Sequence, residues 1–387
     1  MNGTGGVNST GAGGSSDGGG TPQPSDDAST ASPPPAKPGP PILLTVGGGS
    51  ACAASATNLW CWGNNQANPL GINSPIVNPA PLQVKAVGDS VIAMSTSGYA
   101  TCAITASGSL KCWGGDANGE HGDGSTGPER NGPTPVQVTG LTDVTDVSVG
   151  GAVCAIQDGT LFCWGRGTFG QLGNGSTNSS ATPVQVMSLA GRAVSVSVGT
   201  TSTCAVTDDG SVQCWGARLV GGAAMSSMVP VRVDGLTGAA KRVGVGFDFA
   251  CAMMTDETVH CWGSNSNGQL GDGTMDSSTV PTQVTGLQGV KSLSVGGSGA
   301  CAVTADGAAK CWGENKFGAL GNGSTSASPL PVTVSGLDRG VSAVAMGGTS
   351  ACAITSSGVV CWGHNNNGSL GDGSTTDSAV PVHVVGL

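Results

Sequence analysis

The chain has 387 residues, only 10% of them charged, and its formal net charge at neutral pH is −10. Its 14 basic residues form no cluster, which argues against a surface for nucleic acid or anionic membranes. No apolar run is long enough to span a membrane, and the N-terminus carries no apolar signal core.

Residues 1–41 consist mainly of Gly, Ser, Thr, Pro and Asp and end in the sequence PPPAKPGPP. Such a segment cannot bury enough apolar surface to offset the entropy that it would lose on ordering. We therefore expect a disordered tether whose Gly/Ser part is flexible and whose Pro part is stiffer. We also expect that Met1 begins a trimmed or mature form and that a leader is missing.

From Ile42 to Leu387 the chain repeats itself with a period near 50 residues. The second cysteine of each repeat falls at positions 61, 112, 163, 214, 261, 311 and 361. A period of this length without helical apolar periodicity is typical of β-propeller blades. The sequence therefore predicts an all-β fold over residues 42–387, a seven-bladed β-propeller with four short strands in each repeat.

Each repeat contains a predicted β-hairpin with one cysteine in each strand. In the last copy, CAITSSGVVCWG at 352–363, a Ser-Gly turn separates two short apolar runs. Opposed Cβ atoms in antiparallel strands lie about 4.5–5.5 Å apart, close to the separation of about 3.5–4.5 Å in a disulfide. This register also places Ile354 opposite Val359. The seven predicted disulfides, which use all 14 cysteines, are Cys52–Cys61, Cys102–Cys112, Cys154–Cys163, Cys204–Cys214, Cys251–Cys261, Cys301–Cys311 and Cys352–Cys361.

The same register places a tryptophan on the face of each hairpin away from the disulfide. Trp362 stands opposite Ala351 and diagonal to Ala353. The other pairs are Trp62 with Ala51, Trp113 with Thr101, Trp164 with Val153, Trp215 with Thr203, Trp262 with Ala250 and Trp312 with Ala300. A large indole beside small neighbours leaves room for the next blade to interdigitate.

The last repeat shows where the four strands are expected. They are Val341–Met346, Ala351–Thr355, Val359–Trp362 and Val380–Val385, and the matching first strand of repeat one is Ile42–Val46. Closure of the ring must bring Leu387 near Ile42. The pattern leaves open which strands complete the seam.

A second signature follows the hairpin: WGSNSNGQLGDG at 262–273 in repeat five, WGRGTFGQLGNGS in repeat three and WGENKFGALGNGS in repeat six. It resembles the regulator-of-chromosome-condensation repeat of a seven-bladed propeller family that also includes β-lactamase-inhibitor protein II. The likeness implies a propeller over residues 42–387. Repeats one and four depart from it, with NPLGINSP at 68–75 and ARLVGGAAM at 217–225 in place of the full loop.

The eukaryotic founder of that family is known for nucleotide exchange on a small GTPase and for binding chromatin. The family's usual histidine before the hairpin strand is absent here. Ser350 stands in its place, as do Ser50, Ala100 and Ser202 in other repeats. This departure, the acidic balance and the paired cysteines argue against a nuclear, nucleosome-binding role.

Several chemical roles fit the pattern less well than ordinary structure does. Zinc sites usually draw ligands from cysteines two to four residues apart, whereas these pairs are separated by eight or nine residues. The Gly-Asp/Asn-Gly loops offer too few oxygens for calcium and are typical of tight turns; they contain Asp123, Asn174, Asp272, Asn322 and Asp372. The histidines share no spacing with Ser, Asp or Cys; they are His121, His260, His364 and His383. We therefore expect no cofactor, no metal and no enzymatic activity.

Residues that break the repeat are the candidates for partner binding, because aromatic and arginine side chains carry much of the energy of interfaces. One group lies just before the hairpin and the other in the loop after Cys-Trp-Gly. They are Tyr99, Phe247 and Phe249, and Arg166, Phe169, Glu314, Lys316, Phe317 and His364. The alternative is that these rings only cover the edges of neighbouring blades.

These observations favour a monomeric, non-enzymatic interaction module that binds a protein or glycan partner. The cysteine pairs favour an oxidising compartment, so we expect the protein outside the cell, in the periplasm or tethered to a bacterial surface. Two alternatives stay open: a guanine-nucleotide exchange factor, which the family resemblance alone suggests, and an inhibitor of a secreted enzyme such as a β-lactamase.

Overall fold

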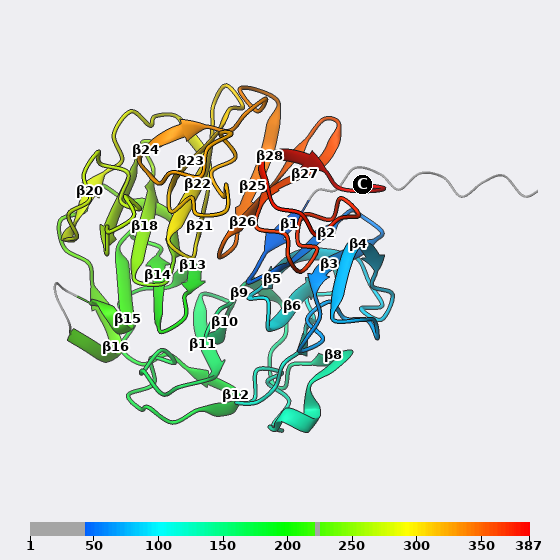
Figure 1. Cartoon of the computed structure of the whole chain (residues 1–387). Helices are drawn as coiled ribbons and strands as arrows, with labels where there is room; N and C mark the ends of the chain where they lie inside the picture. Colours follow the sequence, from blue (N-terminus) through cyan, green and yellow to red (C-terminus); the bar gives the residue numbers. More distant parts are fainter. Residues whose placement is uncertain (1–42, 221–224) are drawn as a thin grey trace, which may run out of the picture. The chain divides into compact units, whose positions relative to one another are not determined.

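The computed structural model describes residues 43–220 and 225–387, which form seven four-stranded antiparallel sheets around a common axis (Figure 1). The prediction of a seven-bladed, all-β propeller is therefore confirmed. The predicted tether over residues 1–41, together with Ile42, lies outside the described residues.

Each blade is built from four strands that are consecutive in the chain, here called A to D from the axis outwards. Blade 1 contains β1 (Leu43–Val46), β2 (Ser50–Ala54), β3 (Leu59–Asn64) and β4 (Val77–Gln83); blade 2 contains β5 (Val91–Thr96), β6 (Ala100–Thr105), β7 (Leu110–Gly114) and β8 (Gly132–Gln137), with a 3₁₀ helix, η1 (Pro128–Arg130), before β8. Blade 3 contains β9 (Val144–Val149), β10 (Ala152–Gln157), β11 (Thr160–Gly165) and β12 (Ser180–Gln185); blade 4 contains β13 (Ala193–Val198), β14 (Ser202–Thr207), β15 (Val212–Val220) and β16 (Met225–Arg232). Blade 5 contains β17 (Ala240–Val245), β18 (Phe249–Met254), β19 (Val259–Gly263) and β20 (Ser278–Gln283); blade 6 contains β21 (Val290–Gly296), β22 (Gly299–Thr304), β23 (Ala309–Gly313) and β24 (Ser328–Thr333). Blade 7 contains β25 (Val341–Met346), β26 (Ser350–Thr355), β27 (Gly358–Gly363) and β28 (Ser378–His383).

The register of the central hairpins agrees with the sequence prediction. In blade 7, Cys352 pairs with Cys361, Ala351 with Trp362, and Ile354 with Val359. All seven predicted disulfides are present, with Cα–Cα distances of 4.0–4.1 Å. The last D strand begins and ends two residues earlier than predicted, because the ladder resumes at Ser378, opposite Gly363, after a bulge.

The core consists of layers between blades rather than one central cluster. In one layer the disulfide face of blade 6, with Cys301 and Cys311, packs against Trp362, Ala351 and Ala353 of blade 7. The same arrangement of a disulfide against the next blade's tryptophan recurs at every junction. The expected interdigitation of large and small residues is therefore present, and it commits both faces of each hairpin to packing.

Hydrogen bonds from the buried indoles join successive blades. Each donates Nε1–H to a backbone carbonyl in the loop between strands C and D of the preceding blade. The pairs are Trp62 with Ser369 (2.9 Å), Trp113 with Pro69 (2.9 Å), Trp164 with Glu120 (3.0 Å), Trp215 with Gln171 (2.8 Å), Trp312 with Gln269 (3.0 Å) and Trp362 with Ala319 (2.8 Å). Trp262 differs, because its buried Nε1 has no acceptor within residues 43–220 and 225–387.

The exception follows from the sequence of blade 4. Its C and D strands, β15 and β16, stay paired up to Val220 and Met225, so they form a longer hairpin than in the other blades. The loop that supplies the acceptor at other junctions is thus replaced in blade 4, one of the two repeats whose sequence departs from the pattern.

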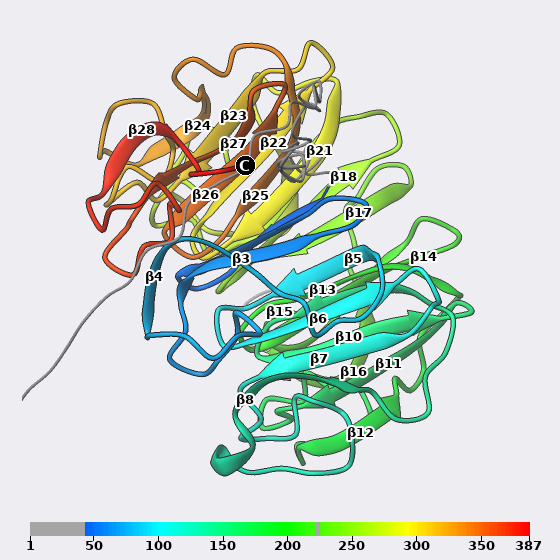
Figure 2. The same cartoon turned by 90° about the vertical axis from the view of Figure 1, so that its right-hand side faces the viewer.

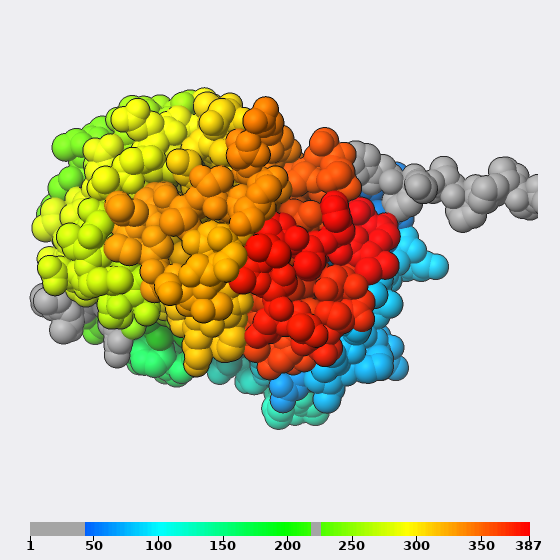
Figure 3. Space-filling view, turned by 45° about the horizontal axis from the view of Figure 1, so that its top comes forward, coloured from blue at the N-terminus to red at the C-terminus, as the bar shows by residue number. Residues whose placement is uncertain are grey.

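The ring closes by the contacts that join the other blades. The indole of Trp62 in blade 1 donates to Ser369 of blade 7, and Gly373 N–H donates to Pro79 O at 2.8 Å. Equivalent backbone bonds join Gly323 to Ala379 and Gly273 to Pro329, both at 2.9 Å. Figure 3 shows the last blade, in red, packed against the first, in blue. Each blade is thus formed by four consecutive strands of its own, and no sheet is shared between blade 7 and blade 1.

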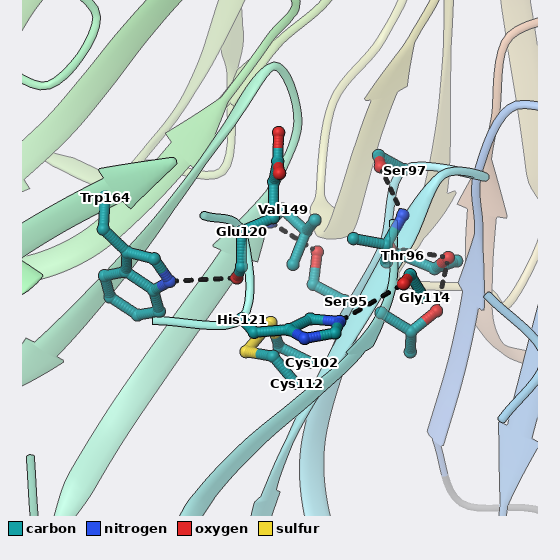
Figure 4. The surroundings of a disulfide bond; sticks show 12 residues. Ser95, Thr96, Ser97, Cys102, Cys112, Gly114, Glu120, His121, Val149 and Trp164 are labelled. Carbon is teal, nitrogen blue, oxygen red and sulfur yellow. Dashed lines mark hydrogen bonds between the residues drawn. A yellow bond between two sulfur atoms is a disulfide. The ribbon is translucent and has the colours of Figure 1, made fainter. Parts of the chain in front are cut away.

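The A strands are edge strands, and their backbone N–H groups at the axis would be unpaired without another acceptor. In most blades a hydroxyl group accepts one of these N–H groups. A Ser or Thr of one A strand accepts the N–H of the next blade's A strand; Figure 4 shows this bond between Ser95 and Val149. The bonds are Thr45 with Thr96 (3.3 Å), Ser95 with Val149 (3.0 Å), Ser148 with Val198 (3.0 Å), Ser197 with Val245 (3.0 Å) and Ser294 with Met346 (2.9 Å). Gly244 and Ala345 hold the same position in blades 5 and 7 and have no hydroxyl to offer.

Candidate binding face

The topology brings two sets of loops to the same end of the ring. Strands A and C run in one direction and strands B and D in the other, so the A–B loops and the C–D loops begin at one end. We call this end the AB/CD face and the opposite end the BC/DA face; Figure 2 shows the blades from the side. The described chain enters at Leu43, the start of an A strand, and ends at Leu387, after a D strand. Both ends therefore belong to the BC/DA face.

Backbone hydrogen bonds fix each A–B loop to the start of the C–D loop of its own blade. Gly115 N–H donates to Tyr99 O at 2.9 Å, and Glu314 N–H donates to Ser298 O at 3.0 Å. His364 N–H donates in the same way to Thr349 O at 3.0 Å. The two groups of candidate residues, which the sequence places in different loops, therefore lie on one face.

Phe169 and Arg166 form a partly exposed pair in blade 3. The Arg166 guanidinium lies 4.9 Å from the centroid of the Phe169 ring, and 39% of Phe169 is exposed. Such a cation–π contact holds both side chains in place while leaving them accessible.

Phe317 and His364 bring blades 6 and 7 together. Their ring centroids are 4.1 Å apart, and Lys316 Nζ lies 5.3 Å from the Phe317 centroid. His364 Nδ1 also lies 3.0 Å from Asp377 Oδ1. Phe317, His364 and Glu314 are half-buried, so this group covers a blade junction and still presents polar edges.

Tyr99 and Phe247 are the aromatic residues nearest the axis. They are 41% and 51% exposed, and both line the opening of the axial channel. The Tyr99 ring lies over Gly115, where a Cβ atom would collide with it.

Phe249 is the exception among the candidates. Its side chain is fully buried in the layer between blades 5 and 6, so it is a core residue and offers nothing to a partner. The two residues differ because Phe247 lies in the A–B loop before β18, whereas Phe249 is the first residue of that strand.

The C–D loops owe their shape to a buried asparagine rather than to a metal. Asn365 is fully buried; its Nδ2 donates to Thr376 O at 3.0 Å, and its Oδ1 accepts Leu370 N–H at 2.9 Å. The Gly-Asp-Gly turn is closed by Asp372 Oδ1, which accepts Ser374 N–H at 2.9 Å. Within the described ranges, no group of three or more His, Cys, Asp or Glu residues is placed to hold a metal ion.

Blade 2 contains a buried polar pair that the sequence comparison between repeats could have found. Asp116 replaces the loop asparagine and His121 replaces the leucine; Nδ1 of His121 lies 3.5 Å from Asp116 Oδ2, and its Nε2 lies 3.2 Å from Gly114 O (Figure 4). Burial raises the pKa of the Asp116 carboxyl, opposed by the hydrogen bond from His121 N–H. Both side chains are at most 2% exposed, so the pair has no access to a substrate and acts inside the loop.

Membrane-spanning helices are absent from the described part of the chain, where none reaches the necessary length and apolarity.

Comparison with known proteins gives one family. The model of the RCC1-like domain matches residues 58–387. The mitochondrial RCC1 domain-containing protein RUG3 of Arabidopsis thaliana is 33% identical over 141 residues, 35% of this chain and 31% of its own length. The human E3 ubiquitin-protein ligase HERC2 is 30% identical over 249 residues, 62% of this chain and 5% of its own length. The chain therefore spans about a third or less of these curated relatives.

Among solved structures, Prp20p of Saccharomyces cerevisiae superposes with a TM-score of 0.76 over 85% of this chain and 86% of its own, at 20% identity. Human WBSCR16 superposes with a TM-score of 0.74 over 86% and 94%, at 21% identity. At this level of identity the two matches establish the fold alone.

Proposed function

The chain belongs to the RCC1-like domain family, and from this premise we propose that it is a non-enzymatic interaction module that holds a protein partner on its AB/CD face. One relative that shares the domain is an E3 ubiquitin-protein ligase in which the matched region is 5% of the whole protein. A propeller alone does not determine function, which depends on its loops.

One observation carries the proposal. Among the candidate residues, every side chain that reaches the surface belongs to loops of the AB/CD face, whereas the residues that repeat in every blade serve disulfides, indole bonds and loop closure. The exposed or half-buried residues are Tyr99, Arg166, Phe169, Phe247, Glu314, Lys316, Phe317 and His364. Aromatic, arginine and histidine side chains on a rigid scaffold are typical of protein interfaces.

The position of the chain ends supports the same face. Leu43 and Leu387 both lie at the BC/DA end, opposite the proposed interface. The seven disulfides favour an oxidising compartment. We therefore propose that the module works outside the cell, in the periplasm or on the cell surface.

Site-specific photo-crosslinking tests the proposal. The photoreactive residue p-benzoylphenylalanine is placed at Tyr99 or Phe169 on the AB/CD face, and at Ile92 or Val385, exposed residues near the opposite end, as matched controls. Each variant is mixed with surface and extracellular fractions of the cells that make the protein, and irradiated. We expect one adduct of defined mass from Tyr99 and Phe169 and none from the controls. Equal adducts from both ends would refute a single binding face.

A further inference from the structure

The axial channel opens on the AB/CD face as a cavity of about 300 Å³. Its wall comes from all seven blades, because each A–B loop bends over the end of its A strand at the axis. We call this cavity the mouth. Since the blades converge there, the mouth lies at the geometric centre of the proposed interface.

The wall of the mouth is mostly glycine backbone because successive A–B loops touch. A Cβ atom at Gly246 would lie 2.6 Å from Gly297 O of the next blade, and one at Gly199 would lie 2.5 Å from Gly246 O. Phe247 N–H also donates to Gly297 O at 2.8 Å, which ties neighbouring loops together. The mouth is therefore a rigid, preformed opening rather than one that side chains close.

The side chains that line the mouth are uncharged and mostly apolar. Below the rim lie residues at the ends of the seven A strands, here called the collar: Val46, Thr96, Val149, Val198, Val245, Val295 and Met346. All but Val295 are at most 7% exposed, because they pack mainly in the layers between blades. The exposed rings of Tyr99 and Phe247 stand beside the opening. No residue that lines the mouth is charged, although the chain as a whole carries a net charge of −10.

Polar and charged side chains surround the mouth farther from the axis. Arg166, Glu314 and His364 follow the last residues of their C strands, and Lys316 lies beside Phe317. An apolar centre within a polar rim is the arrangement of protein–protein interfaces, where the residues of highest energy sit in central, desolvated pockets.

From these observations we propose that the mouth is the anchor pocket of the interface and receives one large apolar side chain, such as Leu, Met or Phe, from a protruding loop of the partner protein. This inference rests on the proposed function and identifies the point of highest binding energy within it. The mouth itself offers no charged side chain that would compensate the desolvation of a Lys, Arg, Asp or Glu anchor; Asp146 and Arg242 line the channel on the other side of the collar.

The chain itself is a poor source for such an anchor. Residues 1–42 contain few large apolar side chains, among them Met1, Val7 and Ile42. The occupant is therefore a second protein that carries the apolar residue in a rigid loop.

Small analogues of single side chains test the chemistry of the mouth without knowledge of the partner. The probes are N-acetyl-leucinamide and N-acetyl-phenylalaninamide, with N-acetyl-lysinamide and N-acetyl-aspartic acid amide as charged controls, added to the full chain labelled in its Val, Leu and Met methyl groups. We expect saturable shifts of the collar methyl signals at roughly millimolar concentration for the apolar probes, given the small number of atoms. Equal or stronger shifts with a charged probe, or no shift at the collar, would overturn the proposal.

A pair of tryptophan substitutions localises the effect. Thr200 lines the mouth and is exposed, so Thr200→Trp is expected to fill the opening without disturbing the core. Val194 is 52% exposed near the other end of the channel, and Val194→Trp is the matched control. We expect Thr200→Trp to abolish the probe shifts and to lower the yield of the partner adduct tenfold or more, whereas Val194→Trp changes neither. Melting temperatures confirm that both variants are folded.

The outcomes separate this inference from the proposed function. If Thr200→Trp leaves the crosslinks from Tyr99 and Phe169 intact and the apolar probes do not bind, the interface stands and the anchor pocket is refuted. If a neutral oligosaccharide shifts the collar signals and the apolar amides do not, the occupant is a glycan and the proposal is wrong. If p-benzoylphenylalanine at Tyr99 and at Phe169 gives no adduct even when Thr200 is unchanged, the proposed function is refuted first.

Discussion

Replacing Trp262 with Phe is expected to cost much less stability than the same replacement at Trp312. Both indoles occupy equivalent positions in neighbouring blades and are at most 2% exposed, so the loss of buried volume is matched. They differ in one interaction: Trp312 Nε1–H donates to Gln269 O at 3.0 Å, whereas Trp262 Nε1 is buried without an acceptor among the residues that the structure describes.

The magnitude follows from that difference. Removing the indole of Trp312 loses a hydrogen bond with a net contribution of about 1 kcal/mol and leaves the Gln269 carbonyl buried and unpaired. The indole of Trp262 has no acceptor within residues 43–220 and 225–387, so removing it relieves an unpaired buried donor, which costs about 1–3 kcal/mol in the native protein. We therefore expect Trp312→Phe to be less stable than Trp262→Phe by about 2 kcal/mol, with Trp362→Phe, whose bond to Ala319 is intact in the native protein, behaving like Trp312→Phe.

Guanidinium chloride unfolding, with all disulfides oxidised and fluorescence from the remaining tryptophans, measures the effect. Midpoints are compared rather than extrapolated free energies, because a repeat array need not unfold in two states. With an m-value of about 5 kcal/mol/M, the expected difference between the midpoints is roughly 0.4 M. Equal midpoints for Trp262→Phe and Trp312→Phe would show that the indole bonds do not hold the blades together.

Three further predictions concern the same framework. Ser197→Ala should lower the free energy of unfolding by about 1 kcal/mol, because Val245 N–H loses its acceptor. Ala345→Ser, between blades 7 and 1, should raise the free energy of unfolding by about 0.5–1 kcal/mol. The two variants should shift the melting temperature in opposite directions, and shifts of the same sign would contradict the role of the hydroxyl groups. Removing one disulfide by the double substitution of Cys301 and Cys311 with Ala should cost about 2–3 kcal/mol, the entropy of a loop of about ten residues, and an unchanged denaturation midpoint would argue against it. The hydrogen bond from Ser211 N–H lowers the pKa of Asp209 to about 2, so its contribution to stability is present above pH 4 and is lost as the pH falls toward 2; Asp209→Asn should flatten the stability profile in that range only, as acid titration of unfolding will show.

The register of the hairpins could be predicted because it depends on local geometry. Cys352 and Cys361 are separated by a short turn, and once they are paired, alternation fixes Trp362 opposite Ala351 without knowledge of any other blade. The blade count followed from the same repeated unit. These features are determined within about ten residues of sequence.

The bonds between blades could not be predicted in this way. Ser197 looks like any polar residue on a strand, and its role appears only when Val245 of the next blade is placed beside it. The sequence groups Phe249 with Phe247 because both break the repeat. Phe249 is buried because it is the first residue of β18, whereas Phe247 lies in the loop before that strand and is exposed. The substitutions of Asp116 and His121 were visible in the sequence, but their contact depends on the fold of a long loop.

The proposed protein is an oxidised, seven-bladed ring that presents its AB/CD face in an oxidising compartment. Intact mass after alkylation under denaturing conditions, with and without reductant, tests this most directly when the protein is isolated from the cells that make it. We predict no labels without reductant and 14 after reduction, one for each cysteine. Labels on most cysteines without reductant would contradict both the disulfides between B and C strands and the proposed location, and would favour an intracellular exchange factor instead.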